Sequence, residues 1–460
     1  MGIGGIGVSA LARLARAAGA VITGCDRKPS ANAEGLAREG VGIWTGHSPD
    51  HLAGVDMVVH TGAVRPDEPE LVAARAAGIE VVDRLPMLLR LAEGRRLLGV
   101  AGSHGKTTTT SFIATLLVEE GLDPSCAIGG VAQSLGGNMR AGNGDWFVAE
   151  IDESDGHIAE AACQIAVLTN VDREHFDHYA DFAAIRSVFA RFLSNTAHDG
   201  TVLVCADCGP AVMLAQASGK RTVTYGLSSG ADYCAANVRL ASAGSRFDAV
   251  GPGKTFRDLD IALPGIHLVQ NAAAAVAVAC ILGLDEAALR RALAGCSRIG
   301  RRFETHALPR GVRMVVDYAH HPAEVAATVA AARIGNPGRV VAVFQPHRYT
   351  RTMHLGEEFG PAFAGFQPAH LEGRGGGRTR GVDDLIVLPI YAASEDQIPG
   401  VTGEVVARSA RRAGVESARY VESRAEAVAE LARVLAEGDT LLVLGAGDVD
   451  AVGEELRALL

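Results

Sequence analysis

The sequence predicts a multidomain α/β protein built on parallel sheets. Short apolar stretches alternate with helix-compatible stretches along the chain, and glycine-rich turns or polar clusters follow many of the apolar stretches. The chain has 460 residues, which is too long for one ordinary core. We therefore expect three domains, over residues 1–94, 95–303 and 304–460: a Rossmann-like N-terminal domain, a central P-loop-type domain with a parallel sheet, and a Rossmann-like C-terminal domain.

The charge balance and the hydropathy pattern exclude several classes of partner. The formal net charge is −10, whereas a protein that binds nucleic acid or a membrane surface needs a basic face. We find neither an apolar run of about 18 residues nor a signal peptide, and expect a cytoplasmic protein. The eight cysteines are scattered, with one close pair at Cys205 and Cys208, and we expect reduced structural thiols rather than zinc or redox chemistry.

The first segment opens with the glycine pattern Gly2-Ile3-Gly4-Gly5-Ile6-Gly7. A helix over residues 8–18 and a strand over residues 20–25 are predicted to follow, and this strand ends in Asp26. The spacing is typical of a dinucleotide-binding turn, in which a helix N-terminus holds a diphosphate and the acidic residue accepts a hydrogen bond from a ribose hydroxyl. The strand that should precede the glycines would lie before Met1, so we expect the first strand of this domain to be missing.

The second segment carries a phosphate-binding loop, Gly102-Ser103-His104-Gly105-Lys106-Thr107-Thr108. An apolar strand over residues 97–101 precedes it, and an amphipathic helix over residues 111–120 is predicted to follow. Glycines let backbone N–H groups approach phosphate oxygens, Lys106 adds a positive charge, and the Thr107 hydroxyl is a ligand for Mg²⁺. The expected ligand is ATP.

Two later strands of this segment each end in polar residues. Residues 146–149 lead to Glu150, and residues 165–168 lead to Thr169, Asn170, Asp172 and His175. Ligands of an open parallel sheet gather at the carboxyl ends of its strands, so we expect these side chains near the phosphate loop. The Glu150 carboxylate suits Mg²⁺. Imidazole suits softer metals, so residue chemistry alone leaves His175 open between metal ligation and a supporting or packing role.

The end of the second segment supplies further candidates. His267 and Asn271 lie four residues apart, before an alanine-rich helix predicted over residues 272–282, and they share one face if this turn is helical. An amide there suits an adenine edge, and a plain helix start is the equal alternative. Arg301 and Arg302 form a guanidinium pair that suits phosphates or carboxylates, with a solvated charge pair as the alternative.

The third segment again alternates strands with helices. Its predicted strands cover residues 313–316, 340–344, 385–388 and 440–444. Polar clusters follow the first two strands, at residues 317–322 and 345–351. Two such clusters at adjacent strand ends favour a substrate pocket over scattered surface polarity.

Together these motifs resemble the Mur ligases. The resemblance rests on the phosphate loop and on residues 148–156, 169–175, 263–271, 301–303, 317–322 and 345–352, which occur in the family's order over nearly the whole chain. It implies an ATP- and Mg²⁺-dependent amide-forming ligase, in which ATP phosphorylates the lactyl carboxylate of UDP-N-acetylmuramate and the amine of L-alanine attacks the acyl phosphate. Such phosphoryl transfer needs positioning and charge neutralisation rather than a protein nucleophile. The implied assembly is a monomer or weak homodimer.

The resemblance also assigns roles to individual residues. The implied ATP site comprises Gly102, Ser103, His104, Gly105, Lys106, Thr107, Thr108, Asn271, Arg302 and Asp317. The implied metal ligands are Thr107, Glu150 and His175, and the implied catalytic residues are Lys106, Glu150, His175 and Arg302. The implied UDP-substrate site comprises Gly4, Gly5, Ile6, Gly7, Asp26, Asn138, Ser154 and Asp155. The implied amino-acid pocket comprises Tyr318, His320, Arg348 and Arg351.

Three other functions stay open at this point. One is the related ligase that recycles a muramyl tripeptide. An NAD-dependent oxidoreductase would suit the first glycine turn alone, and a non-catalytic nucleotide-binding relative would keep the fold. Residues 366–381 depart from the family and include a glycine- and arginine-rich stretch that cannot bury a core. We expect a surface loop there, with a local frame shift or a regulatory insert as the alternatives.

Overall fold

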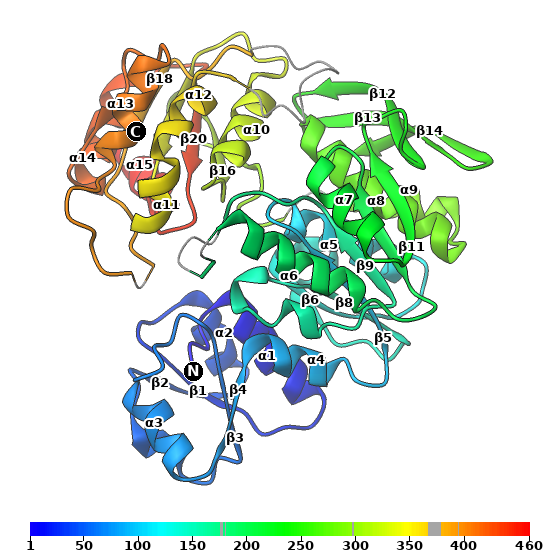
Figure 1. Cartoon of the computed structure of the whole chain (residues 1–460). Coiled ribbons are helices and arrows are strands. Elements are labelled where there is room, and N and C mark those ends of the chain that lie inside the picture. Colours follow the sequence, from blue (N-terminus) through cyan, green and yellow to red (C-terminus); the bar gives the residue numbers. More distant parts are fainter. Residues whose placement is uncertain (175–177, 180, 297–298, 367–378, 394) are drawn as a thin grey trace. The chain divides into compact units, whose positions relative to one another are not determined.

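The computed structural model describes residues 1–174, 178–179, 181–296, 299–366, 379–393 and 395–460 (Figure 1). The chain divides into two compact units, one of Met1–Arg173, His178–Tyr225 and Ala274–Ala292, the other of Glu174–Asp177, Gly226–Ala273 and Leu293–Leu460. Within the described residues, no helix is both long and apolar enough to cross a membrane. The insert predicted as a surface loop lies outside the described residues at positions 367–378.

The N-terminal part of the first unit contains two separate pairs of parallel strands. Strand β1 pairs with β2, and β3 pairs with β4. The first three residues contact both pairs, because the Met1 ammonium donates to the Val59 carbonyl while the Gly2 and Ile3 N–H groups donate to the Cys25 carbonyl. Among the described residues the first element is helix α1. The elements are α1 (Ile6–Ala17), β1 (Thr23–Asp26), α2 (Ala31–Arg38), β2 (Gly42–Thr45), η1 (Pro49–Leu52), β3 (Met57–His60), α3 (Pro69–Ala76), β4 (Glu80–Asp83) and α4 (Arg84–Leu91).

The central part of the first unit is a sheet with strand order β11-β10-β9-β5-β8-β6-β7. All neighbours for which pairing is recorded are parallel except β6 and β7, which are antiparallel, so the prediction of a parallel sheet is wrong for this edge and the sheet is mixed. The connection from β6 to β7 is too short for the crossover that a parallel pair requires. The elements are β5 (Arg96–Ala101), α5 (Lys106–Glu119), β6 (Ser125–Ala132), η2 (Gln133–Leu135), β7 (Gly137–Arg140), β8 (Trp146–Glu150), η3 (Glu153–Asp155), η4 (Ile158–Glu160), β9 (Ile165–Leu168), α6 (Phe182–Ser194), β10 (Thr201–Cys205), α7 (Gly209–Ala217) and β11 (Arg221–Gly226).

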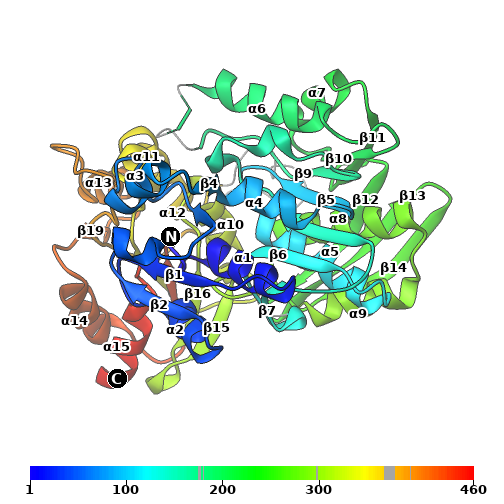
Figure 2. The same ribbon diagram turned by 90° about the horizontal axis from the view of Figure 1, so that it is seen from below.

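Helix α5 differs from the prediction in its start and in its burial. It begins at Lys106 rather than at residue 111, and residues 107–117 are buried on all sides, so the helix is not amphipathic. The core tolerates these polar residues because hydroxyls bond back to the preceding turn: Thr110 donates to the Lys106 carbonyl and Ser111 to the Thr107 carbonyl, each at 2.8 Å. Helix α1 packs against β6 and β7 of the same unit (Figure 2).

The second unit contains an antiparallel meander, β12-β13-β14, and a six-stranded sheet with order β15-β16-β20-β17-β18-β19. In the larger sheet β15 is antiparallel to β16 and the other pairs are parallel. Helices α8 and α9 contribute residues to both units. The elements are β12 (Tyr233–Ala241), β13 (Gly244–Gly251), β14 (Lys254–Ile261), α8 (Ile266–Leu282), α9 (Glu286–Gly295), β15 (Glu304–Ala307), η5 (Pro309–Gly311), β16 (Arg313–Asp317), α10 (Pro322–Arg333), β17 (Val340–Phe344), α11 (Tyr349–Leu355), η6 (Gly356–Glu358), α12 (Phe359–Phe363), β18 (Asp384–Val387), α13 (Glu404–Arg412), β19 (Arg419–Tyr420), α14 (Arg424–Val434), β20 (Thr440–Leu444) and α15 (Ala451–Leu459).

The central strands of the six-stranded sheet are buried on both faces. In β17, Val340, Ala342 and Phe344 pack into one apolar cluster, and Val341 and Val343 pack into another. Helices α10, α12 and α13 supply side chains to the first cluster, and α14 and α15 to the second. A strand covered by helices on both sides has no solvent face, which is why its sequence is a continuous apolar run.

Candidate functional site

The phosphate loop is a tight turn between β5 and α5. Gly102 (φ 132°) and Gly105 (φ 78°) both have backbone angles that favour glycine. A Cβ atom at Gly102 would lie only 2.1 Å from the Thr169 Oγ1 atom, so no larger residue fits there. Helix α5 begins at Lys106, directly after this turn, so the turn ends at a helix N-terminus, which favours a phosphate.

The carboxyl end of β9 holds the loop in this shape. The Asn170 side chain accepts a hydrogen bond from the His104 N–H (2.8 Å) and donates one to the His104 carbonyl (3.0 Å). The Thr169 hydroxyl donates to the same carbonyl at 2.7 Å. Ser103 is also held by the residues after β9, because its hydroxyl accepts a hydrogen bond from the Asp172 N–H at 2.9 Å. The polar residues after β9 therefore shape the loop.

Lys106 is held by the loop and by a carboxylate. Its ammonium donates to the Gly102 carbonyl at 2.6 Å and to the two carboxylate oxygens of Glu153 at 3.0 and 2.9 Å. Burial alone would lower the pKa of Lys106, but the charges of Glu153, Asp152 and Glu150 outweigh burial and raise that pKa above its ordinary value. Lys106 is thus a fixed positive charge at any physiological pH.

Of the two oxygen donors predicted for Mg²⁺, one lies at a strand end and the other in the helix that follows the neighbouring strand. Glu150 is the last residue of β8 and pairs in register with Val100 of β5, and Thr107 is in the first turn of α5. The Glu150 carboxylate accepts the Gly129 N–H at 2.9 Å, and a Cβ atom at Gly129 would lie 2.6 Å from both carboxylate oxygens. A carboxylate and a hydroxyl are hard ligands that suit Mg²⁺. The third predicted ligand, His175, lies outside the described residues.

A hydrogen bond to Asp26 stabilises the first glycine turn. The Asp26 carboxylate accepts the Gly4 N–H at 2.9 Å, and a Cβ atom at Gly4 would lie 2.3 Å from the Ser30 hydroxyl. Helix α1 starts directly after this turn, with Gly5 at its N-cap. The turn thus presents a helix N-terminus, as the sequence predicts, and its acidic residue holds the turn itself.

Three more residues are predicted to contact the UDP substrate: Asn138, Ser154 and Asp155. Asn138 is buried and donates to the Ile6 carbonyl at 2.6 Å, which fastens β7 to the first turn of α1. Ser154 lies in η3, where its N–H donates to the Asp152 carboxylate. The side chain of Asp155 lies outside the described part of the chain. A residue that sequence reasoning missed, Arg84 of α4, lies against Gly7, because a Cβ atom there would meet its guanidinium at 2.9 Å.

In the second unit, Asp317 fastens the Arg301–Phe303 segment to the end of β16. Its carboxylate accepts the Phe303 N–H at 2.7 Å and the Ala319 N–H at 2.8 Å, and burial raises its pKa above the ordinary value. The guanidinium carbons of Arg301 and Arg302 lie 5.1 and 5.0 Å from the centre of the Tyr318 ring. Asp317, Arg302 and Tyr318 therefore form one cluster at the end of β16.

The predicted amino-acid pocket contains an imidazole that sequence reasoning missed. His347 contacts the His320 ring (5.6 Å between centroids) and the Arg351 guanidinium, whose Nη1 lies 3.1 Å from the His347 Nδ1. Burial, together with His320, Arg351 and Arg348, lowers the pKa of His347 to about 2, so its ring is neutral. The Arg351 guanidinium donates to both carboxylate oxygens of Glu174, at 3.0 and 3.3 Å. This fork is the geometry in which an arginine binds any carboxylate.

Arg348 has a left-handed backbone (φ 70°) and begins helix α11. Its N–H donates to the Tyr391 carbonyl at 2.8 Å, and its guanidinium lies 3.6 Å from the Glu395 carboxylate. Glu395 also accepts the Thr350 N–H at 3.0 Å. A non-glycine residue in this region costs on the order of 1 kcal/mol or more, and such strain is concentrated at functional sites.

His267 and Asn271 both lie in α8, which confirms the helix predicted for this segment but extends it back to Ile266. Asn271 is 8% exposed. Burial lowers the pKa of His267 to about 4, with smaller opposing and supporting contributions from Glu324 and Arg302. The imidazole is therefore neutral at physiological pH.

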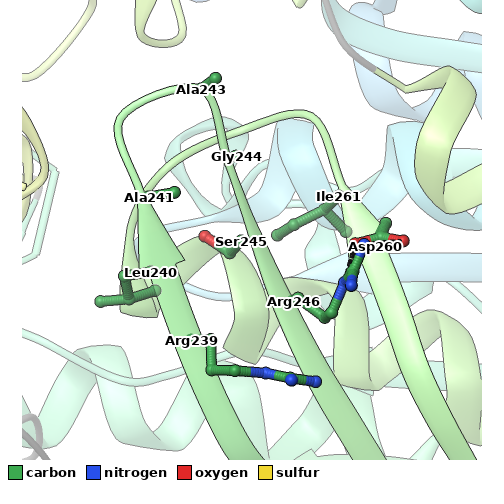
Figure 3. Close-up of a pocket in the computed structure, with 9 residues that line it drawn as sticks. All are labelled: Arg239, Leu240, Ala241, Ala243, Gly244, Ser245, Arg246, Asp260 and Ile261. Atoms are coloured by element: carbon green, nitrogen blue, oxygen red, sulfur yellow. Dashed lines mark hydrogen bonds and ion pairs between the residues drawn. The ribbon is translucent and has the colours of Figure 1, made fainter.

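A surface hollow of about 430 Å³ lies on the meander β12-β13-β14 (Figure 3). Figure 3 shows Arg239, Arg246 and Asp260 along it, with Arg246 and Asp260 paired. None of the residues predicted for the site lines this hollow, and its arginines project from exposed strand faces. It is not a candidate for the reaction.

Three family models match the chain. "Mur ligase family, catalytic domain" matches residues 1–96, "Mur ligase middle domain" residues 100–279, and "Mur ligase, glutamate ligase domain" residues 301–447. The UDP-N-acetylmuramate–L-alanine ligase of Desulfosudis oleivorans is 43% identical over 99% of this chain and 96% of its own length. That of Agrobacterium fabrum is 37% identical over 100% of this chain and 96% of its own. The chain belongs to the Mur ligase family.

Solved structures agree with this assignment. The UDP-N-acetylmuramate–alanine ligase of Thermotoga maritima matches this Mur ligase with a TM-score of 0.80 at 28% identity, over 99% of this chain and 97% of that one. A murein peptide ligase of Psychrobacter arcticus matches with a TM-score of 0.72 at 22% identity over 100% and 97%, which is a likeness of fold. This Mur ligase therefore has the three-domain α/β fold of its family, and its middle domain binds ATP. The exact domain boundaries and the individual site residues remain predictions.

Four residues that contact predicted site residues were not assigned a role from the sequence: Glu153, Arg84, His347 and Glu395. Two of them carry a sequence signal, because Glu153 lies in the acidic run that follows β8 and His347 lies in the polar cluster at residues 345–351. Arg84 and Glu395 stand in ordinary contexts, and only the fold brings them to the residues that they contact.

Proposed function

We propose that this Mur ligase joins L-alanine to the lactyl carboxylate of UDP-N-acetylmuramate at the expense of ATP, through an acyl phosphate, in peptidoglycan precursor synthesis. One observation carries the proposal: relatives named for this reaction match the chain from end to end at about 40% identity. The first glycine turn alone also suits an NAD-dependent oxidoreductase. The phosphate loop of the middle domain argues against that function.

In this proposal the phosphate loop binds the ATP phosphates. Its N–H groups face the phosphate oxygens, and the Lys106 ammonium neutralises charge that develops as the terminal phosphoryl group leaves. Glu150 and Thr107 would hold Mg²⁺, with His175 as a further ligand, and a bound Mg²⁺ would neutralise phosphate charge. Arg302 would contact the terminal phosphate, Asp317 would fix the segment that carries Arg302, and Asn271 would bind the adenine.

The first glycine turn would bind the UDP portion of the substrate. Gly4, Gly5, Ile6 and Gly7 present the N-terminus of α1, which attracts a diphosphate. The Arg84 guanidinium beside Gly7 adds a positive charge at the same place. Asp26, Asn138 and Ser154 would then act chiefly by shaping this site: Asp26 bonds the glycine turn, Asn138 bonds α1, and Ser154 is bonded within its own loop.

Arg351 and Arg348 would bind the carboxylate of L-alanine, with Tyr318 and His320 lining the pocket. The support is geometric, because the Arg351 guanidinium already holds a carboxylate, that of Glu174, through two hydrogen bonds. The Nδ1 atom of neutral His347 accepts a hydrogen bond from this arginine, and its ring adds no competing charge. No protein nucleophile is required, because the acyl phosphate itself is the activated species.

Measurement of ADP release with ATP, Mg²⁺ and UDP-N-acetylmuramate tests the proposal, with product mass as a second readout. The acceptors compared are none, L-alanine, glycine and the L-Ala-D-Glu-diaminopimelate tripeptide. Turnover that depends on L-alanine is the expected result. A preference for the tripeptide would transfer the chain to the recycling ligases, and binding of ATP without turnover for any acceptor would indicate a non-catalytic relative.

A further inference from the structure

Four potential metal ligands gather in the N-terminal part of the first unit, away from the phosphate loop. They are Cys25 of β1, His47 in the loop after β2, His51 of η1 and Glu70 of α3. The Cys25 residue is 2% exposed, and the side chains of His47 and Glu70 are 4% and 5% exposed. The cluster therefore brings a thiol, two imidazoles and a carboxylate into a largely dry interior.

The donor atoms of Cys25, His51 and Glu70 form a compact set, and the His47 Nδ1 lies beside the Cys25 sulfur. Zinc–ligand bonds of about 2.0–2.3 Å place neighbouring ligand atoms of a tetrahedron about 3.3–3.6 Å apart. In this cluster the Cys25 Sγ lies 3.1 Å from the His47 Nδ1 and 3.3 Å from the Glu70 Oε2. The Glu70 Oε2 lies 3.7 Å from the His47 Nδ1 and 3.4 Å from the His51 Nδ1. The donor atoms of Cys25, His51 and Glu70 all lie within 4.8 Å of one another.

A second observation also points to a ligand. The His51 Nδ1 is buried and has no hydrogen-bond partner within the described part of the chain, although it faces the Glu70 carboxylate. A buried polar atom without a partner is uncommon in folded proteins and costs free energy. The His51 ring is held in this orientation by stacking on Trp44, with 4.7 Å between ring centroids. The Glu70 carboxylate already accepts the Ser48 N–H at 3.1 Å, and a cation beside it would give the His51 nitrogen a partner as well.

We propose that Cys25, His51 and Glu70 bind one Zn²⁺ ion as a structural site, with the His47 imidazole beside the Cys25 sulfur. The donor set of sulfur, nitrogen and oxygen favours zinc over Mg²⁺, which prefers oxygen alone. Binding would convert the Cys25 thiol to a thiolate and release its proton to solvent. The site lies in a different part of the chain from Thr107 and Glu150, and it uses none of the residues predicted for catalysis.

The position of the cluster gives the ion a function. The Cys25 carbonyl accepts the Gly2 and Ile3 N–H groups, and the next residue, Asp26, accepts the Gly4 N–H. An ion on the Cys25 sulfur would therefore fix the strand that supports the first glycine turn. It would also join β1 to η1 and α3, which are separate in the sequence (Figure 1).

Cobalt titration of the untagged, chelator-treated full chain tests this site, because Co²⁺ replaces Zn²⁺ and reports a thiolate ligand by a charge-transfer absorption band in the near ultraviolet. The expected result is one equivalent of Co²⁺ with that band, displacement by Zn²⁺ and no displacement by excess Mg²⁺. Cys25→Ser should abolish the band. The matched control Cys280→Ser, at a cysteine in α8, should retain it.

A second pair of variants keeps the test decisive if Cys25→Ser fails to fold. His51→Gln should weaken Zn²⁺ binding at least about tenfold in competition with a chromophoric chelator, whereas His198→Gln at an exposed histidine should not change it. Absence of the band in the wild-type chain, or a band that survives Cys25→Ser, would overturn the proposal. If His51→Gln binds Zn²⁺ as tightly as the wild type, the proposal is also overturned. The residues would then form a hydrogen-bonded cluster that binds no metal.

Discussion

Asn170→Ala is the substitution that most directly tests how the phosphate loop is built. The side chain makes two hydrogen bonds to His104, at 2.8 and 3.0 Å, and contacts no part of the nucleotide in our proposal. Each bond contributes about 1 kcal/mol net, so the loop would lose about 2 kcal/mol of preference for its binding shape. Since 1.4 kcal/mol corresponds to tenfold in an equilibrium, we expect the apparent KM for ATP to rise about thirtyfold.

The assay is the initial rate of ADP release against ATP concentration, at saturating UDP-N-acetylmuramate and L-alanine. The matched control is Asn195→Ala, which removes one exposed hydrogen bond to the Ala159 carbonyl in the same unit. Thermal melting of both variants separates loss of loop shape from loss of fold. A KM for ATP within twofold of the wild type, in an Asn170→Ala protein with an unchanged melting temperature, would refute the argument that β9 shapes the loop.

Three further predictions concern other residues. Lys106→Ala should abolish ADP formation while calorimetry still detects UDP-sugar binding, because the two ligands use different loops; loss of both would remove Lys106 from its assigned role. Arg351→Gln should raise the KM for L-alanine at least about tenfold more than the KM for ATP, because it removes a two-bond carboxylate fork, and equal changes would contradict this. The third follows from the pKa of His267, lowered from 6.5 to about 4 by burial, with Glu324 opposing and Arg302 supporting the shift. As the pH falls below 6.5, His267 becomes protonated in the unfolded chain but stays neutral in the folded chain. The free energy of unfolding should therefore fall by up to about 1.4 kcal/mol for each pH unit. The melting temperature of His267→Gln should therefore depend less on pH between 6.5 and 5, and parallel profiles for the two proteins would be inconsistent with a buried neutral imidazole.

Much of the fold was predictable because buried parallel strands have a distinctive sequence. The strands at Ile165–Leu168, Val340–Phe344 and Thr440–Leu444 have the bounds that their apolar runs predict. The meander β12-β13-β14 was not predicted, since its strands carry exposed charged residues such as Arg246 and Asp260 and lack a continuous apolar run. The burial of helix α5 was predicted wrongly, because its threonines and serine suggest a solvent-exposed face. In the structure the Thr110 and Ser111 hydroxyls donate to backbone carbonyls one turn back, so these polar residues can be buried.

The candidate site was predictable where one local motif carries the chemistry. The glycines at 102 and 105 adopt the backbone that the motif requires, and Lys106 and Thr107 begin the helix. The supporting contacts were not predictable, because they join segments that the sequence separates. Arg84 meets Gly7 through the packing of α4 on α1, and Glu153 reaches Lys106 from the loop after β8. Spacing along a chain contains no information on such pairs until the sheet order is known.

The charges around Lys106 favour a metal ion beside the nucleotide. One positive side chain lies among the carboxylates of Glu153, Asp152 and Glu150, which all raise its pKa, and Arg84 pairs with Asp152. Glu153 and Glu150 leave an excess of negative charge, which would repel a nucleoside triphosphate in a partly buried site. We therefore expect cations to enter with the nucleotide, and a divalent ion on Glu150 would reduce the excess. On this argument the carboxylates that hold Lys106 in place would make ATP binding depend on Mg²⁺.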